Sequence, residues 1–236
     1  MKHRIVCALA ALLVCALLSA AALAFTDDAQ IGPAYREAVE SMTARGVLEG
    51  FEDGSFRAGN TLTREQGAKI ITYLCIGKAA AEALKSDRAP VPDVPAKHWS
   101  APYIAWCVEH EILHGFEDGL FRPGNELTGD QYAKMLLCAL GLARPGNYAD
   151  GGADWYMAVR EDARAAKLYS GDASMESARP ITRGQAALLS LNTSKAAEGS
   201  ATPSPRPSTS PSPSPSPSPS PGTSGGDSDI QLPEAP

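Results

Sequence analysis

The chain has 236 residues, a formal net charge of −6 and an aromatic content of 6%. This acidic balance makes nucleic acid a poor partner, because phosphate binding requires clustered Lys and Arg. Of its five cysteines, three lie beyond the first 24 residues, and an odd number argues against a complete disulfide framework.

Residues 1–24 have the features of a secretory signal peptide. Lys2 and Arg4 provide a basic start, residues 5–18 form a short apolar run, and residues 22–24 read Ala-Leu-Ala. A membrane anchor is the alternative, but the uninterrupted apolar run is short for a span. Cleavage removes two basic residues and no acid, which changes the net charge from −6 to −8. We therefore expect a secreted mature chain without a transmembrane span.

An internal repeat follows. The stretch GFEDGSFRAGNTLT (50–63) returns as GFEDGLFRPGNELT (115–128), with eleven of fourteen positions identical. Its Asp-Gly and Gly-Asn pairs favour turns with positive φ. Each copy ends at a threonine typical of a helix N-cap and is flanked by helical patterns. The repeated unit is therefore predicted to be helix, loop, helix.

The first repeat, with its linker, spans residues 25–89. Its first helix is predicted to begin near Pro33, with Tyr35, Val39 and Met42 on one apolar face. A second apolar helix follows the loop and leads into a linker that prolines interrupt.

Two further repeats complete the predicted domain. The second spans residues 90–144, with Trp99 and Trp106 on one face of its first helix. The third spans residues 145–195 and is degenerate, because its loop is shorter and lacks the Phe-Arg pair, although Trp155 aligns with Trp99. The expected fold class is all-α, built from three helix-loop-helix units.

Residues 196–236 have a different composition. From 203 to 221 the chain alternates almost strictly between Pro and Ser. Such a segment has no apolar surface to offset the entropy of ordering, so we expect a disordered or polyproline-like tail that acts as a spacer.

The three predicted second helices begin alike, with a threonine followed three residues later by a glutamine. This spacing predicts a capping box, in which the two residues satisfy each other's backbone amides, and each cap is worth about 1 kcal/mol. The pairs are Thr63 with Gln66, Thr128 with Gln131, and Thr182 with Gln185.

Arg64 and Arg183 follow two of these caps directly. A cation at a helix N-terminus is unfavourable by roughly 0.3–1 kcal/mol when exposed, so a further role is indicated. Free helix amides beside a guanidinium favour a carboxylate or phosphate ligand. The alternative is an ion pair between Arg64 and a loop acid such as Asp53. The second repeat has Gly129 at this position, so an anion site that depends on the arginine would be weaker in that repeat.

The joined pattern resembles the S-layer homology (SLH) domain: Phe/Val-x-Asp, an aromatic-bearing helix, and then Gly-Phe-Glu-Asp-Gly-x-Phe-Arg-x-Gly-Asn-x-Leu-Thr-Arg. The resemblance covers residues 25 to about 192 as three tandem copies. It implies a three-pronged spindle with pseudo-threefold symmetry and the Thr-Arg helices at its centre. It also implies non-covalent anchoring to secondary cell-wall polysaccharide, through an acidic, pyruvate-modified sugar bound in grooves between adjacent repeats.

The resemblance also implies roles for individual residues. Two arginines would hold the ligand carboxylate, two Asp-Gly pairs would shape the groove wall, and two tryptophans would stack on sugar, with core packing as the alternative for at least one tryptophan. Gly129 and the short third loop imply fewer than three working grooves. The predicted glycan-binding residues are Arg64, Arg183, Asp53, Gly54, Asp118, Gly119, Trp99 and Trp155.

Other chemistry has weaker support in the sequence. Cys107, His110 and His114 have helical spacing, but a fourth metal ligand is not evident. No metal, cofactor or catalytic constellation is therefore predicted, and the chain is not expected to be an enzyme. All three cysteines of the mature chain, Cys75, Cys107 and Cys138, are expected to be free and to lie in the core. The alternative is that two of them form one disulfide.

The alternative function is a secreted protein-interaction or structural module. In that case the SLH scaffold and the Pro/Ser tail would bind wall or S-layer proteins without binding glycan. A cell-wall location is expected in both cases.

Overall fold

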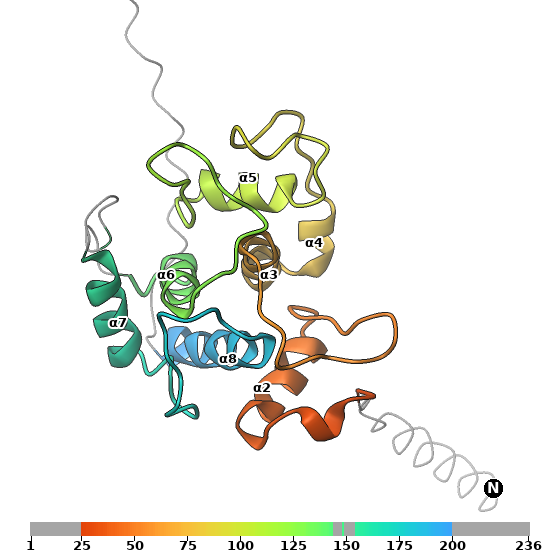
Figure 1. Cartoon of the computed structure of the whole chain (residues 1–236), viewed down its shortest axis with the longest axis vertical. Coiled ribbons are helices and arrows are strands. Elements are labelled where there is room, and N and C mark those ends of the chain that lie inside the picture. The colour runs from red at the N-terminus through yellow and green to blue at the C-terminus, as the bar shows by residue number, and fades with distance from the viewer. Residues whose placement is uncertain (1–24, 144–147, 149–153, 200–236) are drawn as a thin grey trace, which may run out of the picture. The chain divides into compact units, whose positions relative to one another are not determined.

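The computed structural model describes residues 25–143, 148 and 154–199 (Figure 1). The predicted signal peptide lies outside the described residues. Of the predicted tail, residues 196–199 belong to the last helix, and the remainder also lies outside them.

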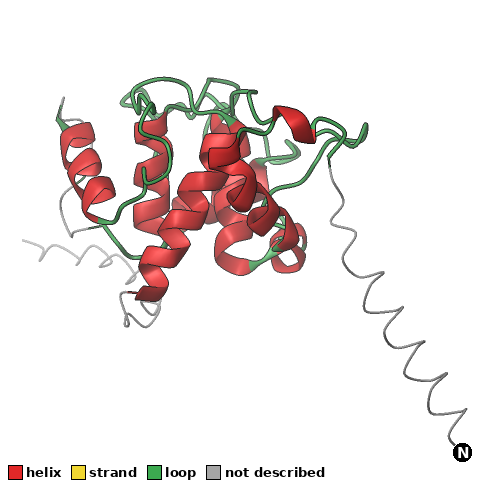
Figure 2. Cartoon of the chain, turned by 90° about the horizontal axis from the view of Figure 1, so that it is seen from below, coloured by secondary structure: helices red, strands yellow, loops and turns green. Residues whose placement is uncertain are grey.

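Helices dominate the described residues (Figure 2), where only isolated β-bridges accompany them. The all-α prediction is confirmed. No helix in the described ranges is both long enough and apolar enough to cross a bilayer. The elements are η1 (Asp28–Gln30), α2 (Pro33–Ala44), α3 (Arg64–Ile76), α4 (Lys78–Glu82), α5 (Ala101–Glu109), α6 (Gly129–Ala139), α7 (Trp155–Ala165) and α8 (Arg183–Gly199).

Helix α2 shows how the local sequence sets an element. Pro33 occupies its first turn, where the missing amide costs nothing. Val39 and Met42 are buried on one face, as the spacing predicted. Gly46 follows the end of the helix with a φ of 69°, a conformation that glycine adopts without strain. The prediction for this helix is confirmed.

All three predicted capping boxes form, at the starts of α3, α6 and α8. In the first, the Gln66 amide donates to Thr63 Oγ1 over 3.4 Å, and the Thr63 amide donates to Gln66 Oε1 over 3.0 Å. The other two boxes repeat both bonds, at Thr128/Gln131 and Thr182/Gln185.

A closed ring of backbone hydrogen bonds joins the three repeats just before these caps. The Leu62 amide donates to the Ile181 carbonyl over 3.0 Å. The Leu127 amide donates to Leu62 and the Ile181 amide donates to Leu127, each over 2.8 Å. All three side chains are almost fully buried. Each repeat therefore donates to one neighbour and accepts from the other, which is a pseudo-threefold arrangement.

Helix packing interlocks the repeats further. Helix α5 of the second repeat packs on α3 of the first, and α7 of the third packs on α6 of the second. Helix α2 of the first repeat packs on α8 of the third, so the segments nearest the two ends of the described chain lie together (Figure 1). The core thus forms between repeats as well as within them.

One detail differs from the sequence-based picture, and the free cysteines agree with it. Helix α5 begins at Ala101, so Trp99 lies in the preceding turn and not on the helix, and its exposed fraction is 49%. Cys75, Cys107 and Cys138 are free thiols, and Cys107 is fully buried between α5 and α3, where its Sγ contacts the Ala68 carbonyl.

Candidate functional site

Arg183, the first residue of α8, extends over the loop of the first repeat. Its Nε donates to the Phe56 carbonyl over 2.9 Å, and its Nη2 donates to the Glu49 carbonyl over 2.6 Å. The guanidinium carbon lies 4.8 Å from the ring centre of Phe51 and 4.6 Å from that of Phe56. Burial lowers the pKa of Arg183 to about 10, so the group stays charged at neutral pH.

These contacts leave part of the Arg183 guanidinium unused. Its Nη1 makes no hydrogen bond to any other residue in the described part of the chain. A guanidinium carries five N–H donors in a planar fork. The two on Nη1 therefore remain available for an acceptor from outside.

Arg64 makes the equivalent contacts with the second repeat, but it is enclosed. Its Nε donates to the Phe121 carbonyl over 2.9 Å, its Nη2 donates to the His114 carbonyl, and both Phe116 and Phe121 lie against the guanidinium. Only 6% of the residue is exposed, and burial lowers its pKa to about 10. The sequence predicted the arginine pair but not this difference in exposure.

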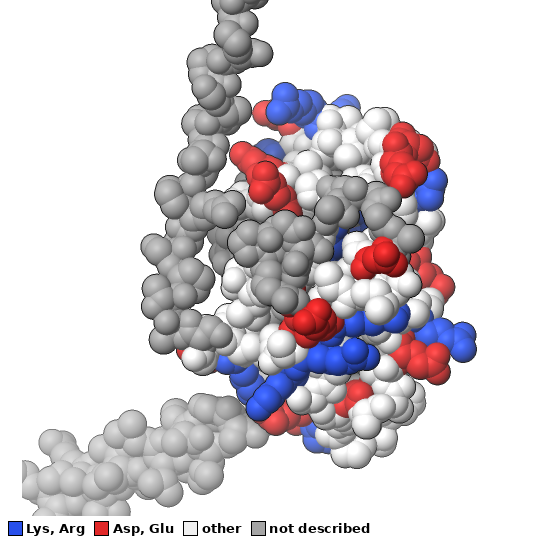
Figure 3. All heavy atoms as spheres, turned by 90° about the vertical axis from the view of Figure 1, so that its left-hand side faces the viewer, with Lys and Arg blue, Asp and Glu red and all other residues white. Residues whose placement is uncertain are grey.

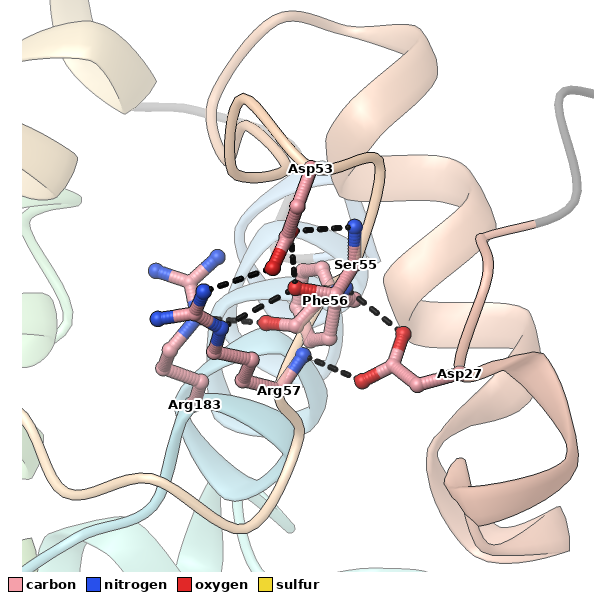
Figure 4. Close-up of polar contacts among 6 residues, drawn as sticks. All are labelled: Asp27, Asp53, Ser55, Phe56, Arg57 and Arg183. Carbon is pink, nitrogen blue, oxygen red and sulfur yellow. Dashed lines mark hydrogen bonds and ion pairs between the residues drawn. The ribbon is translucent and has the colours of Figure 1, made fainter.

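Asp53 does not pair with Arg64, so that alternative from the sequence is wrong. Its Oδ2 accepts from Arg57 Nη2 over 2.7 Å, and its Oδ1 accepts from the Ser55 amide and hydroxyl. These bonds, chiefly those from Ser55 and Arg57, hold the pKa of Asp53 well below its usual range. Figure 4 shows the Arg57 and Arg183 guanidinium groups beside one another, with the Asp53 carboxylate directed at Arg57.

The expectation of free amides at these helix starts is also wrong. The Arg183 amide donates to the Asn60 carbonyl over 2.8 Å, and the Gly184 amide donates to the Ala58 carbonyl over 2.9 Å. The first amides of α3 and α6 are capped in the same way by the next repeat. A ligand carboxylate would therefore meet guanidinium N–H groups and not helix amides.

Asp27 holds this loop from outside the repeated stretch (Figure 4). Its two carboxylate oxygens accept from the Phe56 and Arg57 amides, each over 2.7 Å. Arg57 has a φ of 56°, which is unfavourable for a side-chain-bearing residue unless it is held. Asp93 forms the same pair of bonds in the second repeat. Sequence reasoning omitted both acids as site residues, although the Phe/Val-x-Asp motif contained them.

The predicted Asp-Gly pairs lie at the tips of the loops. Gly54 and Gly119 have φ values of 78° and 76°, which explains the requirement for glycine. Asp118 accepts from the Leu120 amide over 3.0 Å and pairs with Arg122 at 2.6 Å. The two Asp-Gly pairs therefore stabilise the turns at the tips of the loops.

The second and third repeats meet without a central arginine. A Cβ atom added at Gly129 would lie 2.7 Å from Met175 Cε and 2.9 Å from the Ser177 carbonyl oxygen. The third loop therefore occupies the space that a side chain would need. Arg160 reaches this junction from α7, but both its Nε and its Nη2 donate to the Asp130 carboxylate, over 2.9 and 2.6 Å. Its charge is therefore balanced locally.

A cavity of about 240 Å³ lies where Arg183 meets the first repeat. We call it the Arg183 groove. Its lining combines two cations, one acid and three aromatic rings, among them two of the exposed large hydrophobic residues in the described chain, Phe51 and Trp99. Arg64 is not part of the lining. The charged and aromatic residues that line the groove are Glu49, Phe51, Lys69, Tyr73, Trp99 and Arg183.

Trp155, the second predicted stacking residue, packs against the hydrophobic core, with Lys134 Nζ 5.6 Å from its ring centre. On the face that Figure 3 shows, acidic and basic side chains are both present, and several Lys and Arg side chains lie together in its lower half. Of the eight predicted residues, the structure places Trp99 and Arg183 together in the groove, with Asp53 and Gly54 in the adjoining loop.

No group of three or more histidine, cysteine or acidic side chains within the described ranges is arranged to hold a metal ion. Of the three residues considered for one, Cys107 contacts the Ala68 carbonyl, and His110 Nδ1 lies 2.8 Å from the Trp106 carbonyl.

Comparison with known families gives two matches, at residues 24–68 and 92–133, both to the S-layer homology domain. The chain carries SLH domain sequence at both of these segments. One SLH match falls in each of the first two repeats, and together they include Asp27, Asp93 and both long loops.

Curated relatives of this chain include surface-layer proteins and a cellulosome-anchoring protein. It is 31% identical over 144 residues to the surface-layer 125 kDa protein of Lysinibacillus sphaericus. It is 40% identical over 70 residues to S-layer protein sap of Bacillus anthracis, and 30% identical over 88 residues to the cellulosome-anchoring protein of Acetivibrio thermocellus. These matches cover 61%, 28% and 37% of this chain.

The same matches span only 12%, 8% and 20% of the respective relatives, so the similarity concerns a small part of each. The SLH family and the names of these relatives indicate a location at the cell surface.

Proposed function

We propose that this protein attaches to the bacterial cell wall by binding an acidic, pyruvate-bearing secondary polysaccharide in the Arg183 groove. The observation that carries this proposal is the Arg183 guanidinium, which lines a cavity of about 240 Å³ with its Nη1 donors unused. The cellulosome-anchoring and surface-layer relatives support an anchoring role.

Arg183 suits a carboxylate ligand for a geometric reason. Two of its donors are fixed on backbone carbonyls and two aromatic rings flank it, so the guanidinium is held in one orientation before ligand arrives. A preorganised planar fork loses little entropy on binding and forms short, charge-assisted hydrogen bonds with a carboxylate.

The other groove residues suit a sugar ring. Phe51 and Trp99 are 37% and 49% exposed and both line the cavity. Aromatic faces in a concave site favour apolar contact with a ligand, while a few polar groups fix its orientation. Lys69 adds a second cation to the lining. We assign Trp99 to sugar contact and Trp155 to the core.

The remaining predicted residues have supporting roles in this proposal. Asp53 and Gly54 hold the loop that carries Phe51, and Asp118 and Gly119 hold the equivalent loop of the second repeat. Arg64 joins the first two repeats through its enclosed guanidinium. In this proposal the Arg183 groove is the glycan site, with wall polysaccharide as its partner.

The proposal is tested with a pyruvylated glycoside, methyl 4,6-O-(1-carboxyethylidene)hexopyranoside, and its neutral methyl ester. Titration calorimetry on the secreted chain should detect the acid and not the ester. Arg183→Lys keeps the charge but loses the fork, so we expect at least about tenfold weaker binding. Arg179→Gln is the matched control, because Arg179 is exposed and pairs only with Glu176 in the described part of the chain.

Cosedimentation with wall sacculi tests the polymer itself. Binding should require both the secondary polysaccharide and its acidic substituent. Trp99→Ala provides an independent variant, because an exposed residue is removed with little effect on folding. Equal binding of acid and ester, or sedimentation that ignores the polymer, would contradict the proposal and favour a protein partner.

A further inference from the structure

Glu49 places an acid in a groove that we propose takes an acidic ligand. It lines the Arg183 groove, and its backbone carbonyl accepts from Arg183. Left free, its carboxylate would compete with a ligand for the nearby cations and repel it. Two lysines hold it instead: Lys69 at 3.3 Å, and Lys78 through a direct hydrogen bond.

The two lysines differ in position. Lys69 is on α3 and lines the groove, whereas Lys78 does not. Lys78 begins the short helix α4 directly after Gly77, whose φ of 78° turns the chain away from α3. The aliphatic part of Lys78 lies over Gly46, at the end of α2. The chain thus brings Lys78 to Glu49 from outside the cavity.

We propose that Lys78 is a positioning residue for glycan binding: it holds the Glu49 carboxylate so that Lys69 can pair with the acidic group of the glycan in place of Glu49. This inference rests on the proposed function. It makes the Arg183 groove a site with two cations for the ligand, Arg183 and Lys69, and one acid that Lys78 neutralises.

When the three repeats of this chain are aligned, only the first has both the acid and the outer lysine. The position of Glu49 is His114 in the second repeat and Ser170 in the third, and that of Lys78 is Ala143 in the second. The acid and its outer lysine are therefore found together at the junction where an arginine lines a cavity.

The hydrogen bond from Lys78 is also the largest influence on the titration of Glu49. It lowers the pKa of that carboxyl below its usual value, and Lys69 adds to the effect. Because the three side chains are 33–42% exposed, their ion pairs contribute little to folding, and single variants should stay folded. The groove charge can therefore be changed without loss of the fold.

The experiment is a double-mutant cycle on the full chain, with the pyruvylated glycoside as probe and its methyl ester as reference. Lys78→Gln keeps most of the stem and removes the charge, and Glu49→Gln removes the acid. We expect Lys78→Gln to weaken binding of the acid by about fivefold and Glu49→Gln to strengthen it by a similar factor. In the Glu49→Gln background, Lys78→Gln should have no effect on glycan binding, because the groove then contains no Glu49 carboxylate for Lys78 to hold.

Lys195→Gln is the matched control, since it removes a lysine from an exposed ion pair with Glu37 outside the groove. The inference is overturned if Lys78→Gln weakens binding equally in both backgrounds, or if neither single variant differs from Lys195→Gln. Absence of any binding of the acid by the unaltered chain would instead overturn the proposed function, and this inference with it.

Discussion

At the scale of single residues, Asp27 holds the loop that borders the groove. It precedes the repeated stretch, yet its carboxylate accepts from the amides of Phe56 and Arg57 across 29 and 30 residues of sequence. Arg57 has positive φ, and the Phe56 carbonyl beside it accepts from Arg183. Without Asp27 the loop would lose the contact that fixes both groups.

Asp27→Asn is therefore expected to destabilise the protein by about 2 kcal/mol, because a carboxylate that accepts two amides is replaced by a weaker acceptor. Urea unfolding measured by circular dichroism checks this value. Asp28→Asn is the matched control. Its carboxylate forms an exposed pair with Arg36, and its loss should cost less than about 1 kcal/mol. Equal effects of the two variants would contradict the role of Asp27.

The same substitution should change the response to acid. Burial raises the pKa of Asp27, but hydrogen bonds from the Phe56 and Arg57 amides outweigh it, and the pKa lies below its ordinary value. A carboxyl with a lowered folded pKa stabilises the protein above its unfolded pKa of about 4, and this stability is lost as pH falls through the folded value. Asp27→Asn should flatten the decline in stability below pH 4.

At the scale of elements, the three central helices begin with the same cap but differ in their next residue. Arg64 and Arg183 extend into neighbouring loops, whereas Gly129 lies under Met175 and Ser177. The short third loop thus fills the volume that an arginine occupies at the other two junctions. Glycine at this position is a packing requirement.

Gly129→Ala should destabilise the protein by about 1–3 kcal/mol, although alanine favours helix, because the new methyl group meets the Ser177 backbone at 2.9 Å. Thermal unfolding checks the change. Gly124→Ala serves as control, because nothing lies within 4 Å of a side chain there. If alanine at position 129 left stability unchanged or increased it, the third loop would have moved to make room, and the packing requirement would be contradicted.

At the scale of the described domain, the repeats form a closed ring and not a linear array. Each first helix packs on the second helix of another repeat, and Leu62, Leu127 and Ile181 close the ring through their backbone. Removal of one repeat would expose the packing faces of two others. The domain should therefore unfold as one cooperative unit.

A fragment that ends at residue 143 tests this prediction. It loses α7 and α8, so the buried faces of α6 and α2 become exposed. We expect the fragment to lack a cooperative thermal transition, whereas residues 25–199 should show a single one. Circular dichroism and calorimetry compare the two. A stable, cooperative fragment would mean that the first two repeats fold by themselves, as in solenoid proteins.

Local sequence was sufficient to predict the repeat, the turn glycines, the starts of α2 and of the three central helices, and the capping boxes. These features depend on residues within a few positions of each other, such as Thr63 and Gln66, so a short stretch of sequence is enough to predict them. The unusual arginines were also visible, because a cation at a helix start is locally unfavourable.

The contacts of those arginines depend on how the repeats pack together. Arg64 and Arg183 donate to carbonyls that lie 57 and 127 residues away, and neighbouring loops cap the amides that local reasoning left free. The enclosure of one guanidinium and the exposure of the other to a cavity depend on how separate repeats pack. Because burial is a property of the whole fold, no local pattern distinguished the two.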